Sequence, residues 1–314
     1  CRDRLAPCGA TGGDDTLYQI PSRPASIKKR FKPFGGPMKL EFKNNLTEIT
    51  ELEDFDPVKI FECGQCFRWR PDDSGVYTGL FRNHAVSVWR EEEKILIGCD
   101  RETFEAVWHD YFDLDRDYAA IRSAVGIDEY MKKAAEFGKG IRILRQDRWE
   151  ALCSFIISQC NNIPRIRKII EALCENFGEP MEFEGKTLFT FPPAERIAAL
   201  TPSELEPIRC GYRAAYIIDA ARAVTEGRLD LEQLSSAGFE GAIKALKSIS
   251  GIGDKVASCI VLFGLQMLDA FPMDVWIKRV LKENYPDKFS PSVFGKYAGI
   301  AQQYMFFYAR SGQK

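Results

Sequence analysis

The sequence predicts an α+β protein in which a small N-terminal antiparallel β-sheet domain with helices precedes a larger all-α domain. Two observations predict this order. Short runs rich in β-branched and aromatic residues, separated by turn sequences, fill the chain up to about residue 125. From about residue 128 onward, apolar residues recur at the i, i+3, i+4 spacing of amphipathic helices. We therefore expect a sheet-containing domain over 38–125 and a helical domain over 126–314.

The first 37 residues differ from the rest of the chain. They include a stretch rich in glycine and charge, CRDRLAPCGATGGDD, and a basic run over 27–32. Apolar patterning begins only at Met38. We expect residues 1–37 to be a disordered or upstream extension, and Met38 to be the natural start. The alternative is a basic arm that contacts nucleic acid or serves targeting.

Four short runs predict the strands of the first domain. They are Phe67–Arg70, Val76–Phe81, Ala85–Trp89 and Ile95–Cys99. Turn sequences such as PDDSG at 71–75 separate them, which predicts an antiparallel meander. Asp100 is a suitable N-cap for the helix that follows, with Glu102 in its first turn.

Five segments of the second domain carry the helical apolar spacing. They are Trp149–Ile157, Arg165–Phe177, Tyr212–Val224, Lys255–Met267 and Phe294–Arg310. The linkers between them contain proline, glycine and serine, as in Gly178-Glu-Pro180 and 248–253.

Composition excludes several classes of protein. No apolar run approaches the about 18 residues that span a bilayer, and no signal core is present, so we expect an intracellular protein without a membrane partner. The ten cysteines are scattered through apolar stretches, which favours buried free thiols over a disulfide framework. Cys63 and Cys66 form a lone CxxC, and with only two histidines we expect no metal and no cofactor.

The net charge of −2 argues against a general nucleic-acid binder but leaves a local basic face open.

The most informative segment is Leu246-Lys-Ser-Ile-Ser-Gly-Ile-Gly-Asp-Lys-Val-Ala257, which predicts two helices joined by a tight turn. Gly251 and Gly253 permit that turn and leave amide N–H groups uncovered by Cβ atoms. Such groups at a helix N-terminus can hold a phosphate oxygen without a basic side chain. We favour phosphate binding, and a plain connector is the alternative.

Two residues near this turn are candidates for chemistry. Lys255 lies in the first turn of the predicted helix, adjacent to its apolar face, where the helix dipole disfavours a cation. Low dielectric and a positive helix end both favour the neutral amine that Schiff-base chemistry needs. Asp274 follows Pro272 and predicts an N-cap; it can also face Lys255 and stabilise oxocarbenium charge. An exposed lysine and a plain cap are the alternatives.

The sequence resembles the helix-hairpin-helix DNA glycosylases and, among them, the 8-oxoguanine DNA glycosylases. The resemblance covers about residues 55–310. It rests on several motifs in the same order: GQCFRW at 64–69, RILRQD at 142–147, SFIISQCNNIPR at 154–165, GYRA at 211–214, and the block from Gly251 to Asp274.

The resemblance implies an enzyme that flips a damaged base out of double-stranded DNA and excises it. Lys255 would attack C1′, Asp274 would support it, and the resulting imine would permit strand cleavage by β-elimination. The backbone carbonyl of Gly64 would accept from N7–H, which 8-oxoguanine has and guanine lacks. Gln302 would read the base edge, and Phe306 and Cys259 would stack on the base, although core packing is the simpler interpretation for the last two.

The resemblance also implies which residues fill the gap that the flipped base leaves. These are Asn161, Arg165, Tyr212 and Arg213. Cys160 stands where some members of the family carry asparagine, so we expect less strict recognition of the opposite cytosine. Trp276 likewise replaces a histidine of some relatives.

Three alternatives remain open. A related enzyme for oxidised pyrimidine or mispaired adenine often carries a four-cysteine iron–sulfur loop near its C-terminus, whereas the last cysteine here is Cys259. An alkylated-base glycosylase is disfavoured by Lys255. A non-catalytic DNA-binding module would use the hairpin alone. We expect a monomeric enzyme that acts on DNA containing oxidised guanine.

Overall fold

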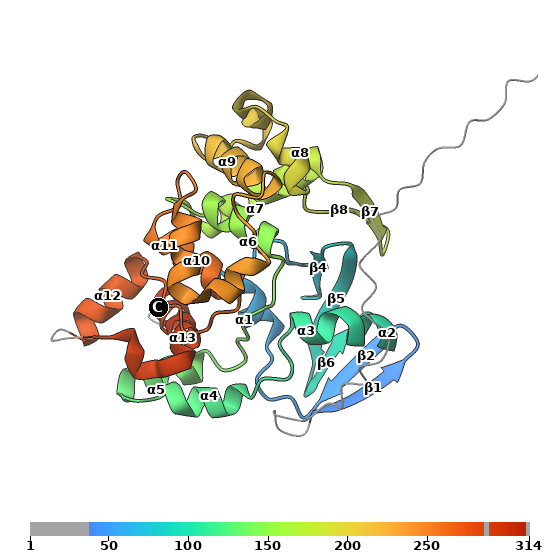
Figure 1. Ribbon diagram of the computed structural model, residues 1–314. Coiled ribbons are helices and arrows are strands. Elements are labelled where there is room, and N and C mark those ends of the chain that lie inside the picture. Colours follow the sequence, from blue (N-terminus) through green and yellow to red (C-terminus); the bar gives the residue numbers. More distant parts are fainter. Residues whose placement is uncertain (1–37, 286–288, 312–314) are drawn as a thin grey trace, which may run out of the picture. The chain divides into compact units, whose positions relative to one another are not determined.

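The structure is a computed structural model that describes residues 38–285 and 289–311. The predicted extension over 1–37 therefore lies outside the described residues. The predicted fold class is confirmed, because an antiparallel sheet precedes a helical region that continues to Ser311 (Figure 1).

The sheet has six antiparallel strands in the order β1-β2-β6-β5-β4-β3. The strands are β1 (Lys39–Lys43), β2 (Leu46–Thr50), β3 (Arg70–Pro71), β4 (Tyr77–Phe81), β5 (His84–Glu91) and β6 (Lys94–Ile97). Strands β3 to β6 form the predicted meander, and β1 and β2, which the sequence analysis did not single out, extend it at the β6 edge.

The first predicted strand is mostly wrong, because only Arg70 of the run 67–70 lies in a strand. The Trp69 ring turns inward and stacks on Phe61, with 3.9 Å between ring centroids. It also fills the space beneath Gly79, where a Cβ atom would come within 2.3 Å of the ring. Burial of this aromatic side chain thus takes the segment out of the sheet.

Short helices cover the sheet and share its core. They are α1 (Pro57–Glu62), α2 (Arg101–Thr103), the π-helical turn η1 (Phe104–Trp108) and α3 (His109–Tyr111). The predicted cap is confirmed, since the Asp100 side chain accepts from Thr103 N at 2.7 Å. Trp69, Trp108 and Phe112 are buried at the centre of this first core.

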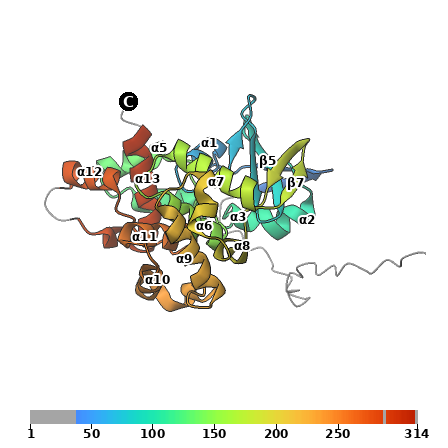
Figure 2. The same cartoon turned by 90° about the horizontal axis from the view of Figure 1, so that it is seen from above.

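The helical region follows. Its α-helices are α4 (Tyr118–Val125), α5 (Glu129–Phe137), α6 (Arg148–Ile157), α7 (Ile163–Phe177), α8 (Ala194–Ala198), α9 (Arg213–Thr225), α10 (Gly238–Lys247), α11 (Asp254–Phe263), α12 (Val275–Asn284) and α13 (Ala298–Ser311). Its 3₁₀ helices are η2 (Pro202–Ile208), η3 (Gln233–Ala237) and η4 (Pro291–Tyr297). Helix α6 contacts α7, α9 and α11 and so lies at the centre of the second core (Figure 2).

Two features of this region differ from the sequence-based expectation. A two-stranded hairpin, β7 (Pro180–Phe183) and β8 (Lys186–Phe189), interrupts the helices where only a linker was expected. Helix α4 falls within the predicted first domain, yet Tyr118, Ile121 and Val125 pack in the core of the helical region. The domain boundary near residue 125 stays a prediction.

Among the residues that the structure describes, no helix is long and apolar enough to cross a membrane.

Candidate active site and DNA-binding surface

Lys255 lies at the edge of the apolar face of α11, as predicted. The helix begins at Asp254, and Gly253 occupies its N-cap position with an extended backbone. Val256, Cys259 and Ile260 face the core and are buried, whereas Lys255 is half-buried beside them. The amine therefore lies at the boundary between the core and the surface.

Asp274 is the N-cap of α12, which confirms its predicted structural role. Its side chain accepts a hydrogen bond from Ile277 N at 2.8 Å. Burial raises the pKa of the Asp274 carboxyl, and the Ile277 hydrogen bond and the positive charge of Lys255 oppose part of that rise. Lys255 and Asp274 thus lie within electrostatic reach of each other, from two different helices.

Cys259 lies one helical turn after Lys255 on the same helix. Burial raises the pKa of its thiol to about 11, although the Lys255 charge opposes this. A thiol with such a pKa is neutral near pH 7, so it is a poor nucleophile. A soft apolar surface next to the amine suits the predicted stacking role better than chemistry of its own.

Gly64 and Phe306 lie against each other. Gly64 has φ +87, and a Cβ atom there would lie 3.4 Å from both Phe306 and Ile163. The Arg310 guanidinium lies over the Phe306 ring, 5.3 Å from its centroid. Two residues that the sequence analysis missed fix this contact: Gln303 donates to Cys63 O at 2.7 Å, and Arg310 donates to Glu62 O at 2.5 Å.

Gln302 supplies an unused acceptor on α13. The residue is 4% exposed, and its buried Oε1 has no hydrogen-bond partner among the described residues. A buried oxygen without a donor is costly in a folded protein and is a sign of an absent ligand or water. Helix α13 also packs closely on α11, since a Cβ atom at Gly299 would lie 2.3 Å from Leu262 Cδ1. The helices of Gln302 and Lys255 are therefore neighbours.

The predicted hairpin joins α10 to α11. Ile249 and Ile252 are buried and anchor the turn in the core. Gly251 has φ +79, and Gly253, which carries no side chain to cap the helix, is exposed. The first amide N–H groups of α11 have no intrahelical acceptor. The structure thus confirms the predicted turn, and its contact with a phosphate group stays a prediction.

The two glycines of the hairpin predict different mutational outcomes. Gly251→Ala forces a side chain into the left-handed region and within 2.2 Å of the Tyr216 ring, so we expect a loss of about 2–4 kcal/mol in the free energy of unfolding. Gly253→Ala meets no atom within 4 Å and should cost about 1 kcal/mol or less. Denaturant unfolding measures both values.

Gly253→Ala also tests the predicted contact with a phosphate group. The Cβ atom of the alanine would cover the first backbone N–H groups of α11, so duplex affinity should fall while the protein remains folded. Unchanged affinity would remove the hairpin from the DNA interface.

A second surface gathers the predicted gap-filling residues. Tyr212 is 55% exposed, and the Arg213 guanidinium lies over its ring at 4.5 Å from the centroid. Arg213 itself is buried and donates to Gln159 O at 3.0 Å and to Cys210 O at 3.2 Å. It therefore holds the turn that precedes α7, a structural role that sequence analysis missed.

That turn carries the remaining predicted residues. Cys160 is exposed with φ +46, Asn161 donates to Ile157 O at 3.3 Å, and Arg165 is exposed in the first turn of α7. The structure thus brings this turn beside Tyr212 and Arg213. Their contacts with an unpaired base stay predictions.

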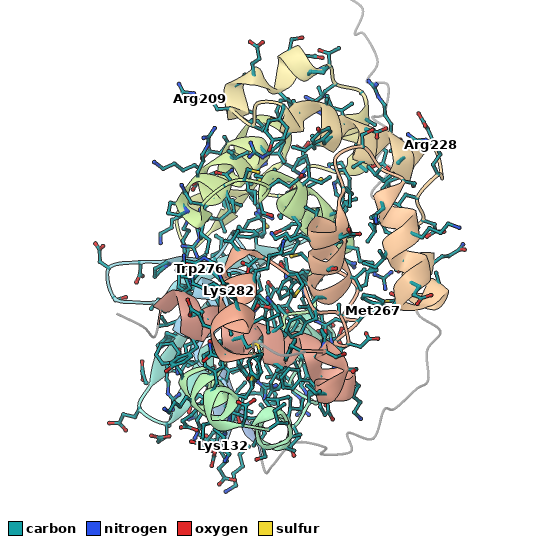
Figure 3. The ribbon with its side chains drawn as sticks, turned by 90° about the vertical axis from the view of Figure 1, so that its left-hand side faces the viewer. Lys132, Arg209, Arg228, Met267, Trp276 and Lys282 are labelled. Atoms are coloured by element: carbon teal, nitrogen blue, oxygen red, sulfur yellow. The ribbon has the colours of Figure 1, made fainter. Side chains whose placement is uncertain are left out.

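Helix α12 carries Trp276 in its first turn and Lys282 in its last turn (Figure 3). The Arg279 guanidinium lies over the half-buried Trp276 ring, 5.3 Å from its centroid. Trp276, which stands two positions after Asp274 where the resemblance gives some relatives a histidine, thus contacts a cation of its own helix.

The CxxC pair is part of the core. Cys63 and Cys66 are free and buried, and burial raises the pKa of the Cys63 thiol to about 11. Within residues 38–285 and 289–311, no three histidine, cysteine or acidic residues are arranged to hold a metal ion.

Two family models match consecutive parts of the chain. The model described as 8-oxoguanine DNA glycosylase, N-terminal domain, matches residues 48–152, and that described as HhH-GPD superfamily base excision DNA repair protein matches residues 153–292. The N-glycosylase/DNA lyase of Saccharomyces cerevisiae is 31% identical over 252 residues, which cover 72% of this chain and 67% of the yeast protein. The chain belongs to the 8-oxoguanine DNA glycosylase family.

Two solved structures share its fold. MBOgg1, solved in complex with a low-affinity DNA ligand, is 40% identical with a TM-score of 0.84, over 88% of this chain and 100% of that one. The Clostridium acetobutylicum 8-oxoguanine glycosylase/lyase, solved with double-stranded DNA containing cytosine opposite to 8-oxoG, is 38% identical with a TM-score of 0.83, over 88% and 99% of the two chains. The predicted 8-oxoguanine DNA glycosylase family and fold are confirmed.

Proposed function

We propose that this 8-oxoguanine DNA glycosylase excises its base and cleaves the strand through one imine formed by Lys255. The protein is an N-glycosylase with lyase activity that acts on duplex DNA in base excision repair. The observation that carries the mechanism is that Lys255 and Asp274, at the N-terminal ends of α11 and α12, lie close enough for the charge of Lys255 to act on the Asp274 carboxyl.

The chemistry follows from these two groups. The neutral Lys255 amine attacks C1′, and the bond from C1′ to the base breaks as the base leaves with the electron pair. The Asp274 carboxylate stabilises the positive charge that develops on the sugar. Loss of a proton from the amine opens the sugar ring to an imine. Removal of a C2′ proton then expels the 3′ phosphate by β-elimination, and water releases the enzyme.

The lesion is read by the turn at Gly64 and by α13. The Gly64 carbonyl accepts from N7–H of 8-oxoguanine, whereas it faces a lone pair in guanine. The unpaired Gln302 Oε1 accepts from the N–H groups of the base edge. Phe306 and Cys259 contact the two faces of the base. A buried acceptor left without its donor rejects a wrong substrate by orders of magnitude.

Two turns hold the duplex: the Gly251–Gly253 turn between α10 and α11, and the turn that precedes α7. The Gly251–Gly253 turn binds a phosphate through its amides. Asn161, Arg165 and Tyr212 occupy the gap left by the flipped base and contact the opposite strand. The predicted DNA contact of Arg213 does not fit its burial, and Arg213 instead holds the turn at Gln159 and Cys160 from within the protein. Exposed Cys160 cannot donate as an amide does, so discrimination for cytosine is weaker. Because the substrate is cellular DNA, the protein works inside the cell; a nuclear or nucleoid address and a monomeric state stay predictions.

Three duplexes test how the base is read. They carry 8-oxoguanine, guanine or 8-bromoguanine at one position opposite cytosine. We expect excision of 8-oxoguanine only, because 8-bromoguanine has a substituent at C8 but no N7–H to donate to Gly64. Excision of 8-bromoguanine at a comparable single-turnover rate would show that shape at C8 is read, and not the N7 proton.

A further inference from the structure

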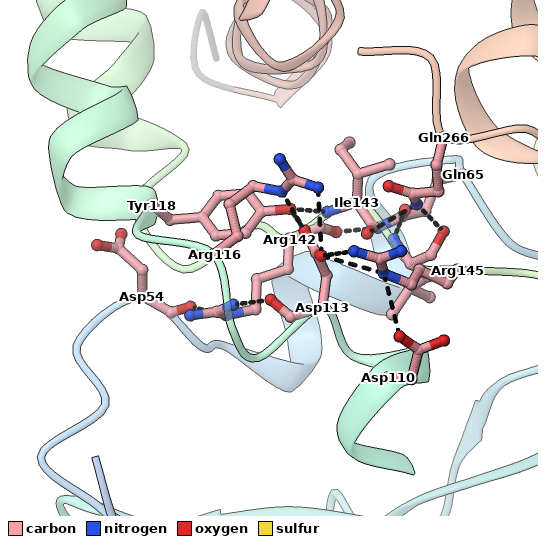
Figure 4. Close-up of polar contacts among 11 residues, drawn as sticks. Asp54, Gln65, Asp110, Asp113, Arg116, Tyr118, Arg142, Ile143, Arg145 and Gln266 are labelled. Carbon is pink, nitrogen blue, oxygen red and sulfur yellow. Dashed lines mark hydrogen bonds and ion pairs between the residues drawn. The ribbon is translucent and has the colours of Figure 1, made fainter. Parts of the chain in front are cut away.

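Two glutamine side chains bind the backbone of the segment 142–144 (Figure 4). Gln65 is completely buried. Its amide nitrogen donates to Arg142 O at 2.7 Å and to Ile60 O at 3.0 Å, and its oxygen accepts from Leu144 N at 2.9 Å. One side chain therefore pairs with the segment through both a donor and an acceptor, as a neighbouring strand would.

Gln266 binds the same segment. Its amide nitrogen donates to Ile143 O at 3.2 Å and to Leu144 O at 2.7 Å. Its backbone has φ +58, and its buried Oε1 has no partner among the described residues. A non-glycine residue in the left-handed region persists only where its surroundings fix it, and such residues gather at functional sites.

Gln65 lies next to the turn proposed to read the base, and Gln266 lies just after the helix that carries the amine. Gln65 directly follows Gly64, and its own carbonyl accepts from Gln146 Nε2 at 2.9 Å. Gln266 follows α11, which ends at Phe263 and carries Lys255. The segment 142–144 thus links the turn that reads the base to the helix that carries the amine.

The segment itself is fixed. The Arg142 side chain is 2% exposed and donates to Asp54 O and Asp113 O, both at 2.6 Å. The Ile143 N–H donates to the Tyr118 hydroxyl at 2.9 Å. These contacts anchor the segment, so it cannot follow a movement of either glutamine without breaking buried hydrogen bonds.

We propose that Gln65 and Gln266 are positioning residues that set the place of the Gly64 carbonyl relative to the Lys255 amine. The inference rests on the proposed roles of Gly64 and Lys255. Excision needs the base held at Gly64 while C1′ is presented to Lys255, and a misplacement of about 1 Å can cost on the order of 10²-fold in rate. Strand cleavage at an abasic site has no base to hold, so it needs the Lys255 amine but not the Gly64 carbonyl.

The test compares these two reactions in the same preparation of the full chain. Gln266→Gly removes the amide but suits the positive φ, and Gln65→Met removes the amide at nearly constant volume. Single-turnover rates are measured on an 8-oxoguanine:cytosine duplex and on a duplex with a preformed abasic site. We expect excision to fall by roughly 10-fold or more, and abasic-site cleavage to change by less than about 2-fold. Gln233→Met, which removes an exposed amide from η3, serves as the control.

The ratio of the two rates decides the outcome. A merely structural role predicts equal losses in both reactions, and that result, or an unchanged ratio in Gln266→Gly, would overturn the inference. If Gln65→Met fails to fold, Gln266→Gly alone decides. A wild-type enzyme that cleaves abasic sites but does not excise 8-oxoguanine would instead overturn the proposed function, so the two failures are distinguishable.

Discussion

Lys255→Gln is expected to lower the single-turnover rate of 8-oxoguanine excision by at least roughly 10³-fold, because it removes the nucleophile. Lys255 is half-buried at the edge of α11, so an uncharged side chain of similar length should leave the fold intact. Cleavage of abasic sites should be lost to the same extent, since both reactions pass through the same amine.

The experiment measures the rates of excision and of abasic-site cleavage together with the affinity for the duplex. Duplex affinity should remain within a few-fold of wild type, because the hairpin amides and the exposed side chains of the second surface are unchanged. Lys282→Gln removes one positive charge from the exposed end of α12 and should leave both rates as they are. Retained excision by Lys255→Gln would refute the imine mechanism, whereas equal losses in both variants would show that only net charge matters.

Asp274→Asn is expected to lower excision by about 10²–10³-fold with little loss of stability. Asparagine still accepts the hydrogen bond from Ile277 N and is among the preferred N-cap residues. The carboxylate charge opposite Lys255 is lost, and with it the stabilisation of the oxocarbenium-like transition state. Asp274→Ala removes the cap as well and should cost about 1 kcal/mol in the free energy of unfolding.

The pH dependence of stability and of the excision rate distinguishes the two roles of Asp274, as the N-cap of α12 and as the carboxylate opposite Lys255. Burial raises the pKa of Asp274 above its ordinary value of 3.8, so the folded protein holds this proton more tightly than the unfolded chain does. Its contribution to the free energy of unfolding therefore falls as pH rises through the window above 3.8. Excision needs the ionised carboxylate, so the acid limb of the wild-type rate profile should lie above that value. Asp274→Asn should not show this fall in rate at acid pH. If the variant does show it, the fall comes from protonation of another group.

Local sequence signals predicted the elements that bear the chemistry. The 3.6-residue period of α11 placed Lys255 beside the apolar face, and a proline followed by Asp274 predicted the cap of α12. Both predictions are confirmed because capping and amphipathic spacing depend on residues a few positions apart. The meander was predicted for the same reason, since its strands are joined by short turns.

Features that depend on distant residues could not be predicted in this way. Gly64 and Phe306 are 242 positions apart in the sequence, and only the family resemblance paired them before the structure showed their contact. No sequence pattern around Gln65 or Gln266 indicates that both side chains bind the segment 142–144. The β7–β8 hairpin was missed because Gly178 and Pro180 predict a linker equally well. The roles of the individual site residues stay predictions, and the burial of Arg213 does not fit the predicted contact with DNA.

Borohydride trapping tests the central claim most directly. Wild-type protein and Lys255→Gln are incubated with a labelled duplex that contains one 8-oxoguanine opposite cytosine, and the imine is reduced as it forms. We predict a covalent protein–DNA adduct with wild type only, with peptide mapping that places the DNA on Lys255. A wild-type protein that binds the duplex without forming an adduct, or an adduct that persists in Lys255→Gln, would contradict the account.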